Sequence, residues 1–153
     1  MKKKGFSLIE LLIVIAIMAI LGSLALSAFS TARKQGRDTT RKGDLAQYKV
    51  ALEQYYTANN SYPTTGGAVH NSETSVGSVF TTSGPLSSFM GGNPPRGLSI
   101  PNKKYYYASD GTTYYLQADL EVGTCWEICA NGRSGVLSAI CSSSQGSLTC
   151  HIP

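Results

Sequence analysis

Four cysteines are the residues of this chain best suited to covalent or metal chemistry. An even number of cysteines in a loop-rich tail, behind an N-terminus that resembles an export signal, favours disulfide bonds. Four cysteines allow three pairings, and the sequence leaves all three open. A zinc site is the weaker alternative, because the spacing fits no standard zinc pattern, even with His151 next to the last cysteine. The four all lie in the last 29 residues: Cys125, Cys129, Cys141 and Cys150.

A second residue with a chemical role is Glu10, the only charged residue in the 24 residues from Phe6 to Phe29. About 20 apolar residues are enough for a helix to cross a bilayer. A charge inside a bilayer costs about 2.5–3.5 kcal/mol, so either a partner compensates it or it has a function. The sequence therefore predicts a transmembrane helix over residues 6–29 with one carboxylate at its start.

No arrangement of residues predicts catalysis. His70 and His151 have no nucleophile or carboxylate in a supporting context, and no glycine-rich phosphate loop follows a strand. We therefore predict that the chain is not an enzyme and binds no cofactor or metal. Of the net charge of +4, three charges come from residues 2–4, which leaves +1 without them. This gives little electrostatic reason to expect nucleic-acid binding.

One long helix should position Glu10. No proline occurs before Pro63, and an apolar stripe follows the 3.6-residue period. We expect one helix from about residue 6 to about residue 60, ending before Pro63. Its second half, residues 30–62, should pack on a sheet, and Gly22, Gly36 and Gly43 are candidate bends. The stripe consists of Leu45, Tyr48, Leu52, Tyr55 and Tyr56.

A small antiparallel sheet should follow a long loop. Residues 63–102 are rich in Gly, Ser, Thr, Pro and Asn, and predict a loop between helix and sheet. Within the last region, 103–153, Asp110-Gly111 predicts a turn between strands at 105–107 and 113–120. Further strands are expected at 135–141 and 147–152. The predicted fold class is α+β, with the long helix packed on this sheet.

Alternation assigns side chains of the second strand to two faces. Residues 114, 116, 118, 120 and 122 should face the helix stripe, and residues 115, 117, 119 and 121 should point away from it. We interpret the tyrosines of the hairpin as strand residues on a half-exposed face rather than as a binding surface. These tyrosines are Tyr105, Tyr106, Tyr107 and Tyr115.

The segment Lys4-Gly5-Phe6-Ser7-Leu8-Ile9-Glu10 resembles the leader of type IV prepilins. Residues 33–64 more loosely resemble the helix end and first loop of the major pseudopilins of type II secretion. The resemblance implies a pilin fold. It also implies that residues 1–5 are a leader peptide, cut after Gly5 by a prepilin peptidase that then N-methylates Phe6.

The same resemblance implies how such a chain assembles. Glu10 would pair with the N-terminal amine of a neighbouring subunit in a helical homo-oligomeric filament. Assembly would need a membrane platform with a cytoplasmic ATPase. Before assembly the chain would cross the bacterial plasma membrane once, with its N-terminus in the cytoplasm. Afterwards it would form an extracellular or periplasmic filament.

Alternative interpretations remain open at this point. Within the class, the chain is either a pilin or a pseudopilin of a type II secretion or DNA-uptake system. A different class is an exported disulfide-bonded binding module, either cut near Ala25-Leu26-Ser27 or tethered by an uncut signal anchor. Five Lys and Arg residues between Arg33 and Lys42 outnumber the three before the apolar segment, which by the positive-inside rule favours the opposite orientation. The resemblance and the cysteines favour a body outside the cytoplasm.

Overall fold

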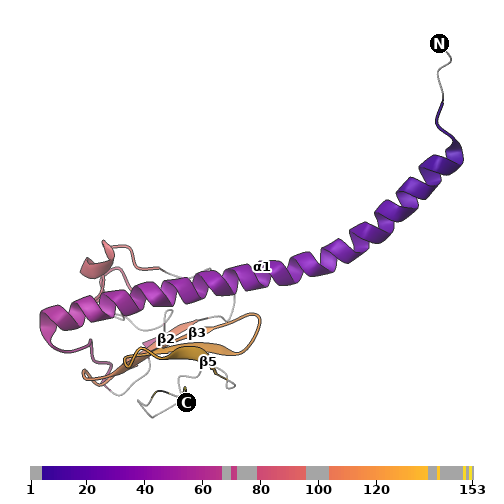
Figure 1. The fold of residues 1–153 in the computed structure, drawn as a ribbon. Coiled ribbons are helices and arrows are strands. Elements are labelled where there is room, and N and C mark those ends of the chain that lie inside the picture. Colours follow the sequence, from indigo (N-terminus) through magenta and orange to yellow (C-terminus); the bar gives the residue numbers. More distant parts are fainter. Residues whose placement is uncertain are drawn as a thin grey trace.

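A long helix lies across a five-stranded antiparallel sheet in this α+β protein (Figure 1), as predicted. The computed structural model describes residues 5–66, 70–71, 79–95, 104–137, 141, 150 and 152, without the side chains of residues 24–28 and 70–71. The strand order is β1-β2-β3-β4-β5, and every neighbouring pair is antiparallel. The elements are α1 (Leu8–Asn59), β1 (His70–Asn71), the 3-10 helix η1 (Ser88–Met90), β2 (Tyr105–Ser109), β3 (Tyr114–Asp119), β4 (Cys125–Cys129) and β5 (Ser134–Leu137).

The helix α1 is a single element of 52 residues, about 78 Å long at 1.5 Å per residue. It ends where Asn60 adopts the left-handed conformation and donates its backbone N–H to the carbonyl of Tyr56 at 2.7 Å. The helix curves gently as it leaves the sheet (Figure 1) and continues without a break through its three glycines. Each interior glycine weakens a helix by about 1 kcal/mol relative to alanine. A Cβ atom at Gly36 or Gly43 would meet nothing within 4 Å.

The apolar stripe of α1 packs against the sheet as predicted. Leu45, Tyr48 and Leu52 are fully buried, and they share one core with the side chains of β3 that alternation assigned to this face. Burying each such side chain contributes about 1.5–3 kcal/mol. Tyr56 is the exception: it remains 38 % exposed and lies 4.7 Å, centroid to centroid, from the ring of Tyr62.

The other face of the sheet is buried as well, which the alternation did not predict. Tyr115, Gln117 and Asp119 are each at most 6 % exposed. Two disulfide bonds hold parts of the C-terminal region against the face to which these side chains point. Val122 was assigned to the core but is 41 % exposed, because β3 ends at Asp119 and the alternation stops there.

The tyrosines of the hairpin are mostly core residues, so the predicted half-exposed face is wrong for three of the four. Tyr105, Tyr107 and Tyr115 are at most 1 % exposed, and only Tyr106 is half-buried. The hydroxyl of Tyr105 donates to Asp44 Oδ2 at 2.5 Å, and that of Tyr107 donates to the carbonyl of Pro63 at 2.8 Å. Burial raises the pKa of both phenols. These hydroxyl groups bond within the subunit and are not a binding surface.

The hairpin of β2 and β3 forms around Asp110-Gly111 as predicted, with Gly111 at a φ of 95°. The predicted strand at 135–141 corresponds to β5, with residues 138–140 outside the described part. Of the strand predicted at 147–152, only Cys150 and Ile152 are described, and neither belongs to a strand. The sequence analysis missed β4, because it assigned no strand to residues 125–129, and it missed β1, which lies in the predicted loop.

Candidate functional site

The side chains of Phe6 and Glu10, at the start of α1, are both exposed. Phe6 is 82 % exposed, and Ser7 precedes the helix in an extended conformation. Glu10 lies in the first turn, where its backbone N–H bonds to the carbonyl of Ser7 at 3.1 Å. Its carboxylate is exposed and has no hydrogen-bond or ion-pair partner among the described residues. Glu10 is therefore accessible to a group from outside the subunit. Residues 1–4 of the predicted leader lie outside the described part.

The first half of α1 exposes its apolar side chains all around the helix. Those of residues 6–21 that are large and apolar are between 46 % and 87 % exposed. Patches of this kind mark surfaces that another protein or a membrane covers. The side chains are Phe6, Leu8, Ile9, Leu11, Leu12, Ile13, Val14, Ile15, Ile17, Met18, Ile20 and Leu21.

Within the part of the chain that the structure describes, no helix is both long enough and apolar enough to span a membrane.

An ion pair joins α1 to the connection between β3 and β4. The Nε and Nη2 atoms of Arg37 donate to the two carboxylate oxygens of Glu121 at 2.6 and 2.7 Å. This bidentate geometry is the strong form of an arginine–carboxylate interaction. The hydrogen bond from Arg37 holds the pKa of Glu121 below its usual value and raises the pKa of Arg37.

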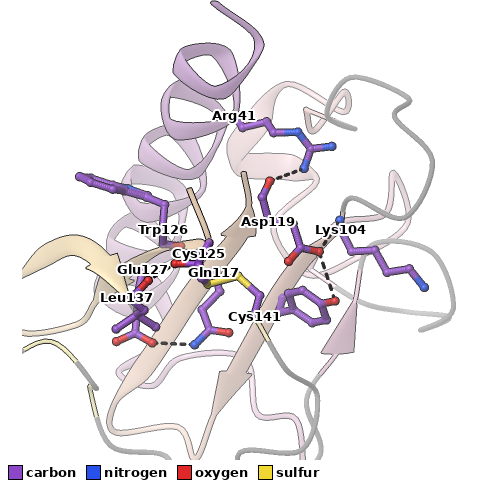
Figure 2. Close-up of a disulfide and its surroundings, with 11 residues drawn as sticks. Arg41, Lys104, Gln117, Asp119, Cys125, Trp126, Glu127, Leu137 and Cys141 are labelled. Atoms are coloured by element: carbon purple, nitrogen blue, oxygen red, sulfur yellow. Dashed lines mark hydrogen bonds between the residues drawn. A yellow bond between two sulfur atoms is a disulfide. The ribbon is translucent and has the colours of Figure 1, made fainter. Parts of the chain in front are cut away.

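Two further side chains of α1 bind the same connection. The buried carboxylate of Asp38 accepts the backbone N–H groups of Glu121 and Val122, each at 2.8 Å. The guanidinium of Arg41 is buried and donates to the carbonyl of Asp119 at 3.1 Å (Figure 2). We call Arg37, Asp38 and Arg41 with residues 119–122 the neck clamp, because it lies where α1 leaves the sheet. The sequence analysis counted Arg37 and Arg41 only as charges flanking a membrane segment. Nothing in the sequence pointed to partners some 80 residues away.

The cysteines form two disulfide bonds, Cys125–Cys141 and Cys129–Cys150. The prediction of disulfides is confirmed, and the structure selects one of the three pairings. Both bonds begin on β4, so they tie the C-terminal region to one strand of the sheet; Figure 2 shows the first.

Glu127 is a completely buried carboxylate between these two bonds. Its Oε2 atom accepts a hydrogen bond from Gln117 Nε2 at 2.7 Å (Figure 2), and its Oε1 atom lies 3.3 Å from Cys129 Sγ. The ligand atoms of Glu127, Cys129 and Cys150 lie within 4.8 Å of one another. Because the two sulfur atoms are bonded to each other, neither is a free thiolate, which is the form that binds metal.

Comparisons with known proteins identify the N-terminal region. Residues 1–26 match the family model described as a prokaryotic N-terminal methylation motif. The chain is 44 % identical over 66 residues to a type IV wide pilus major component of Thermus thermophilus, covering 43 % of this chain and 50 % of that protein. It is 34 % identical over 64 residues to a type II secretion system core protein G of Pseudomonas aeruginosa, covering 42 % and 45 %. The chain thus spans about half the length of these relatives.

A longer alignment exists with another type II secretion system core protein G, from Klebsiella michiganensis. It is 25 % identical over 144 residues and covers 94 % of this chain and 85 % of that protein. No solved structure matches the chain.

The chain thus combines a long helix whose apolar first half is exposed, a match to a methylation motif at the start of that helix, and a small disulfide-bonded sheet. The matched motif and these relatives support a place for the chain in the type IV pilin and pseudopilin family. This is a family of structural subunits rather than of enzymes.

Proposed function

We propose that the chain is the structural subunit of a type IV pilus-like filament that polymerises through α1. The observation that carries this proposal is the exposed apolar first half of α1, with the accessible carboxylate of Glu10 in its first turn. Exposing so much apolar surface to water is unfavourable by about 25 cal/mol per Å², and side-by-side packing of many such helices would remove it.

Processing at the N-terminus would prepare the helix for assembly. Gly5 is exposed, and Ser7 has the extended backbone that precedes the helix, so the bond between Gly5 and Phe6 is accessible to a peptidase. A prepilin peptidase would cut there and N-methylate Phe6. The family model that covers residues 1–26 supports this step.

The pairing of Glu10 with the N-terminal amine of a neighbouring subunit would set the register between helices. Each group alone is costly to bury, because it loses its hydration in an apolar environment. Together they attract strongly at low dielectric, and each satisfies the other. Correct axial register would therefore be favoured over registers that leave the two charges apart.

Before assembly, the 24 residues from Phe6 to Phe29 would hold the chain in the plasma membrane, with the N-terminus in the cytoplasm. A membrane platform with a cytoplasmic ATPase would then extract the chain into the filament. The finished filament would be extracellular or periplasmic, which fits the two disulfides of the sheet region.

Mass spectrometry of the chain from a sheared surface fraction, without reductant, tests this proposal. We expect a chain that begins at methylated Phe6 and is lighter by two hydrogen atoms per disulfide bond. In the same system Glu10→Ala and Glu10→Gln should both be processed but should not assemble. Ser7→Ala is the control, because the Ser7 side chain makes no capping hydrogen bond. A chain that begins near Ala28, or filaments that form normally with Glu10→Ala, would refute the proposal.

A pseudopilin of a type II secretion system is the second candidate. The alignment with the Klebsiella core protein G, which extends over almost the whole chain, favours it. Deleting the gene separates the two functions: loss of surface filaments alone indicates a pilin, and loss of protein secretion with no surface filaments indicates a pseudopilin.

A further inference from the structure

The strand β4 carries three residues with metal-binding side chains on one of its faces. Successive side chains of a strand point to opposite faces, so Cys125, Glu127 and Cys129 share the face to which both disulfides are attached. Each of the three is at most 1 % exposed. Burying a carboxylate is unfavourable unless its surroundings compensate the charge. The proposed function gives Glu127 no role, so its burial between two cysteines requires another explanation.

The carboxylate of Glu127 is directed at one of the two disulfides and is held there by a neighbouring side chain. Its Oε1 atom lies 3.3 Å from Cys129 Sγ, and its Oε2 atom accepts a hydrogen bond from Gln117 Nε2 at 2.7 Å (Figure 2). Gln117 occupies the position opposite Glu127 on β3. The ligand atoms of Glu127, Cys129 and Cys150 all lie within 4.8 Å of one another, and no other such group of three occurs in the described part of the chain.

The distance between Glu127 and Cys129 suits two ligands of one zinc ion. Zinc holds a thiolate sulfur at about 2.3 Å and a carboxylate oxygen at about 2.1 Å, with its ligands in a tetrahedron. Two such ligands lie about 3.6 Å from each other, and Glu127 Oε1 and Cys129 Sγ lie 3.3 Å apart. Two thiolates on one ion lie about 3.8 Å apart, so the bond between Cys129 and Cys150 must be broken before both sulfur atoms bind zinc. A zinc site therefore exists only in the reduced chain.

We propose that the reduced chain binds one zinc ion through Glu127, Cys129 and Cys150, and that formation of the Cys129–Cys150 bond releases it. Soft thiolate ligands favour zinc over magnesium and calcium. The hydrogen bond from Gln117 orients the carboxylate, as the outer partners of metal ligands commonly do. Three protein ligands leave the fourth position of zinc to a water molecule. Gln117 Oε1 is buried and has no hydrogen-bond partner among the described residues, so it is an acceptor for that water.

The exchange of zinc for the disulfide balances in atoms and electrons. The oxidant is a disulfide compound, which the chain meets outside the cytoplasm. The thiolate of Cys150, which is more exposed than that of Cys129, attacks one sulfur of the oxidant and forms a mixed disulfide, while one oxidant thiolate leaves. The thiolate of Cys129 then attacks the Cys150 sulfur, and the second oxidant thiolate leaves. Two cysteine thiolates are oxidised, one disulfide is reduced, and Zn²⁺ loses two of its three protein ligands.

The other cysteine pair provides a matched control on the same strand. Among the described residues, Cys125 and Cys141 have no third ligand close to both. The variant Cys125→Ser/Cys141→Ser therefore keeps the proposed site. The variant Cys129→Ser/Cys150→Ser removes the site but retains the same number of thiols. This inference does not depend on the proposed function, because it concerns one isolated chain.

Titration of the reduced full chain in detergent with Co²⁺, a coloured substitute for Zn²⁺, tests the site. In Cys125→Ser/Cys141→Ser we expect one equivalent of Co²⁺ to produce thiolate charge-transfer and tetrahedral absorption bands, which Zn²⁺ then removes. In the same background Glu127→Gln should weaken Co²⁺ binding at least about tenfold, because even the loss of an outer-shell partner costs about 10–100-fold. Glu121→Gln should leave the affinity unchanged, because Glu121 bonds to Arg37 instead. The fluorescence of Trp126 in the oxidised proteins checks that the variants fold.

Several outcomes would overturn the inference. Equal Co²⁺ affinity in the two double-cysteine variants would mean that any cysteine pair of this chain chelates the ion. Equal affinity in Glu127→Gln and Glu121→Gln would exclude the carboxylate as a ligand, and this is also the result expected if the reduced chain binds Co²⁺ only when unfolded. The absence of the absorption bands would exclude the site altogether. Glutathione disulfide should release one ion for each Cys129–Cys150 bond formed, and a chain that keeps its ion after oxidation would contradict the exchange.

Discussion

Replacing Asp38 by alanine should destabilise the packing of α1 on the sheet more than any neighbouring surface substitution. The Asp38 carboxylate is 5 % exposed and accepts two backbone N–H groups, each at 2.8 Å. Alanine removes both acceptors at once and leaves two donors at the turn after β3 without their partner. Asp38→Asn should not restore the loss, because its amide can accept only one of the two N–H groups and directs a donor at the other.

The magnitude follows from the two hydrogen bonds. A hydrogen bond to a charged group contributes about 1.5–3 kcal/mol. Val122 is partly exposed, so water can replace part of what its N–H group loses. We therefore expect the free energy of unfolding to fall by about 2–4 kcal/mol. With a denaturant slope near 2 kcal/mol per M, the urea midpoint falls by about 1–2 M.

Urea titration of the full chain in detergent, followed by the fluorescence of Trp126, measures this change. Trp126 is the single tryptophan, and its ring lies 4.4 Å from Lys42 Nζ, close to the neck clamp. Thr39→Ala is the matched control, because Thr39 is exposed and its hydroxyl bonds only to its own helix. A loss for Asp38→Ala no larger than that of the control would refute the role assigned to this carboxylate.

Three further predictions concern acid, alkali and the disulfides. Arg37 lowers the pKa of Glu121, so their ion pair stabilises the fold above the ordinary glutamate pKa of about 4.3, and this stabilisation is lost as pH falls through the pKa of Glu121 in the folded protein. In Glu121→Gln the urea midpoint should therefore depend less on pH between pH 2 and 6 than it does in the parent chain. The same pH dependence in both proteins would contradict this. Burial raises the pKa of Tyr62 to about 12, so the stability that its neutral phenol contributes is complete below pH 10 and is lost as pH rises through the pKa in the folded protein. Tyrosinate absorbance should therefore rise together with unfolding rather than before it. The variant Cys129→Ser/Cys150→Ser opens a bond that spans 21 residues and should lose about 3 kcal/mol in the urea titration; a midpoint equal to that of the parent would show that this bond does not stabilise the fold.

Local signals made part of this fold predictable. The apolar period of α1, the proline after its end and the Asp110-Gly111 turn each depend on residues within a few positions of one another. The segment Cys125–Cys129 carries an equally local alternation, but it places two cysteines and Glu127 on one face. That pattern indicates a buried strand only when the disulfides that cover its face are known. The sequence left their pairing open.

In the candidate site, too, some features are visible in the local sequence and others depend on distant residues. Gly5, Phe6 and Glu10 belong to a short motif that the sequence shows directly, and their roles in processing and assembly remain proposals. The neck clamp was not predictable, because Asp38 accepts N–H groups from residues 83 and 84 positions further along the chain. Charges at positions 37, 38 and 41 also fit a solvated helix, and only the path of the connection after β3 gives them partners.

The neck clamp has a mechanical consequence for a subunit under tension. A pull along the axis of α1 enters the sheet region through the hydrogen bonds of residues 37, 38 and 41 to residues 119–122, which would be loaded together. From there the force passes into β3, which ends at Asp119, and into β4, the strand that both disulfides tie to the C-terminal region. Covalent bonds therefore reinforce the strand that follows the loaded connection. The sheet would resist peeling at the point where the helix transmits the load.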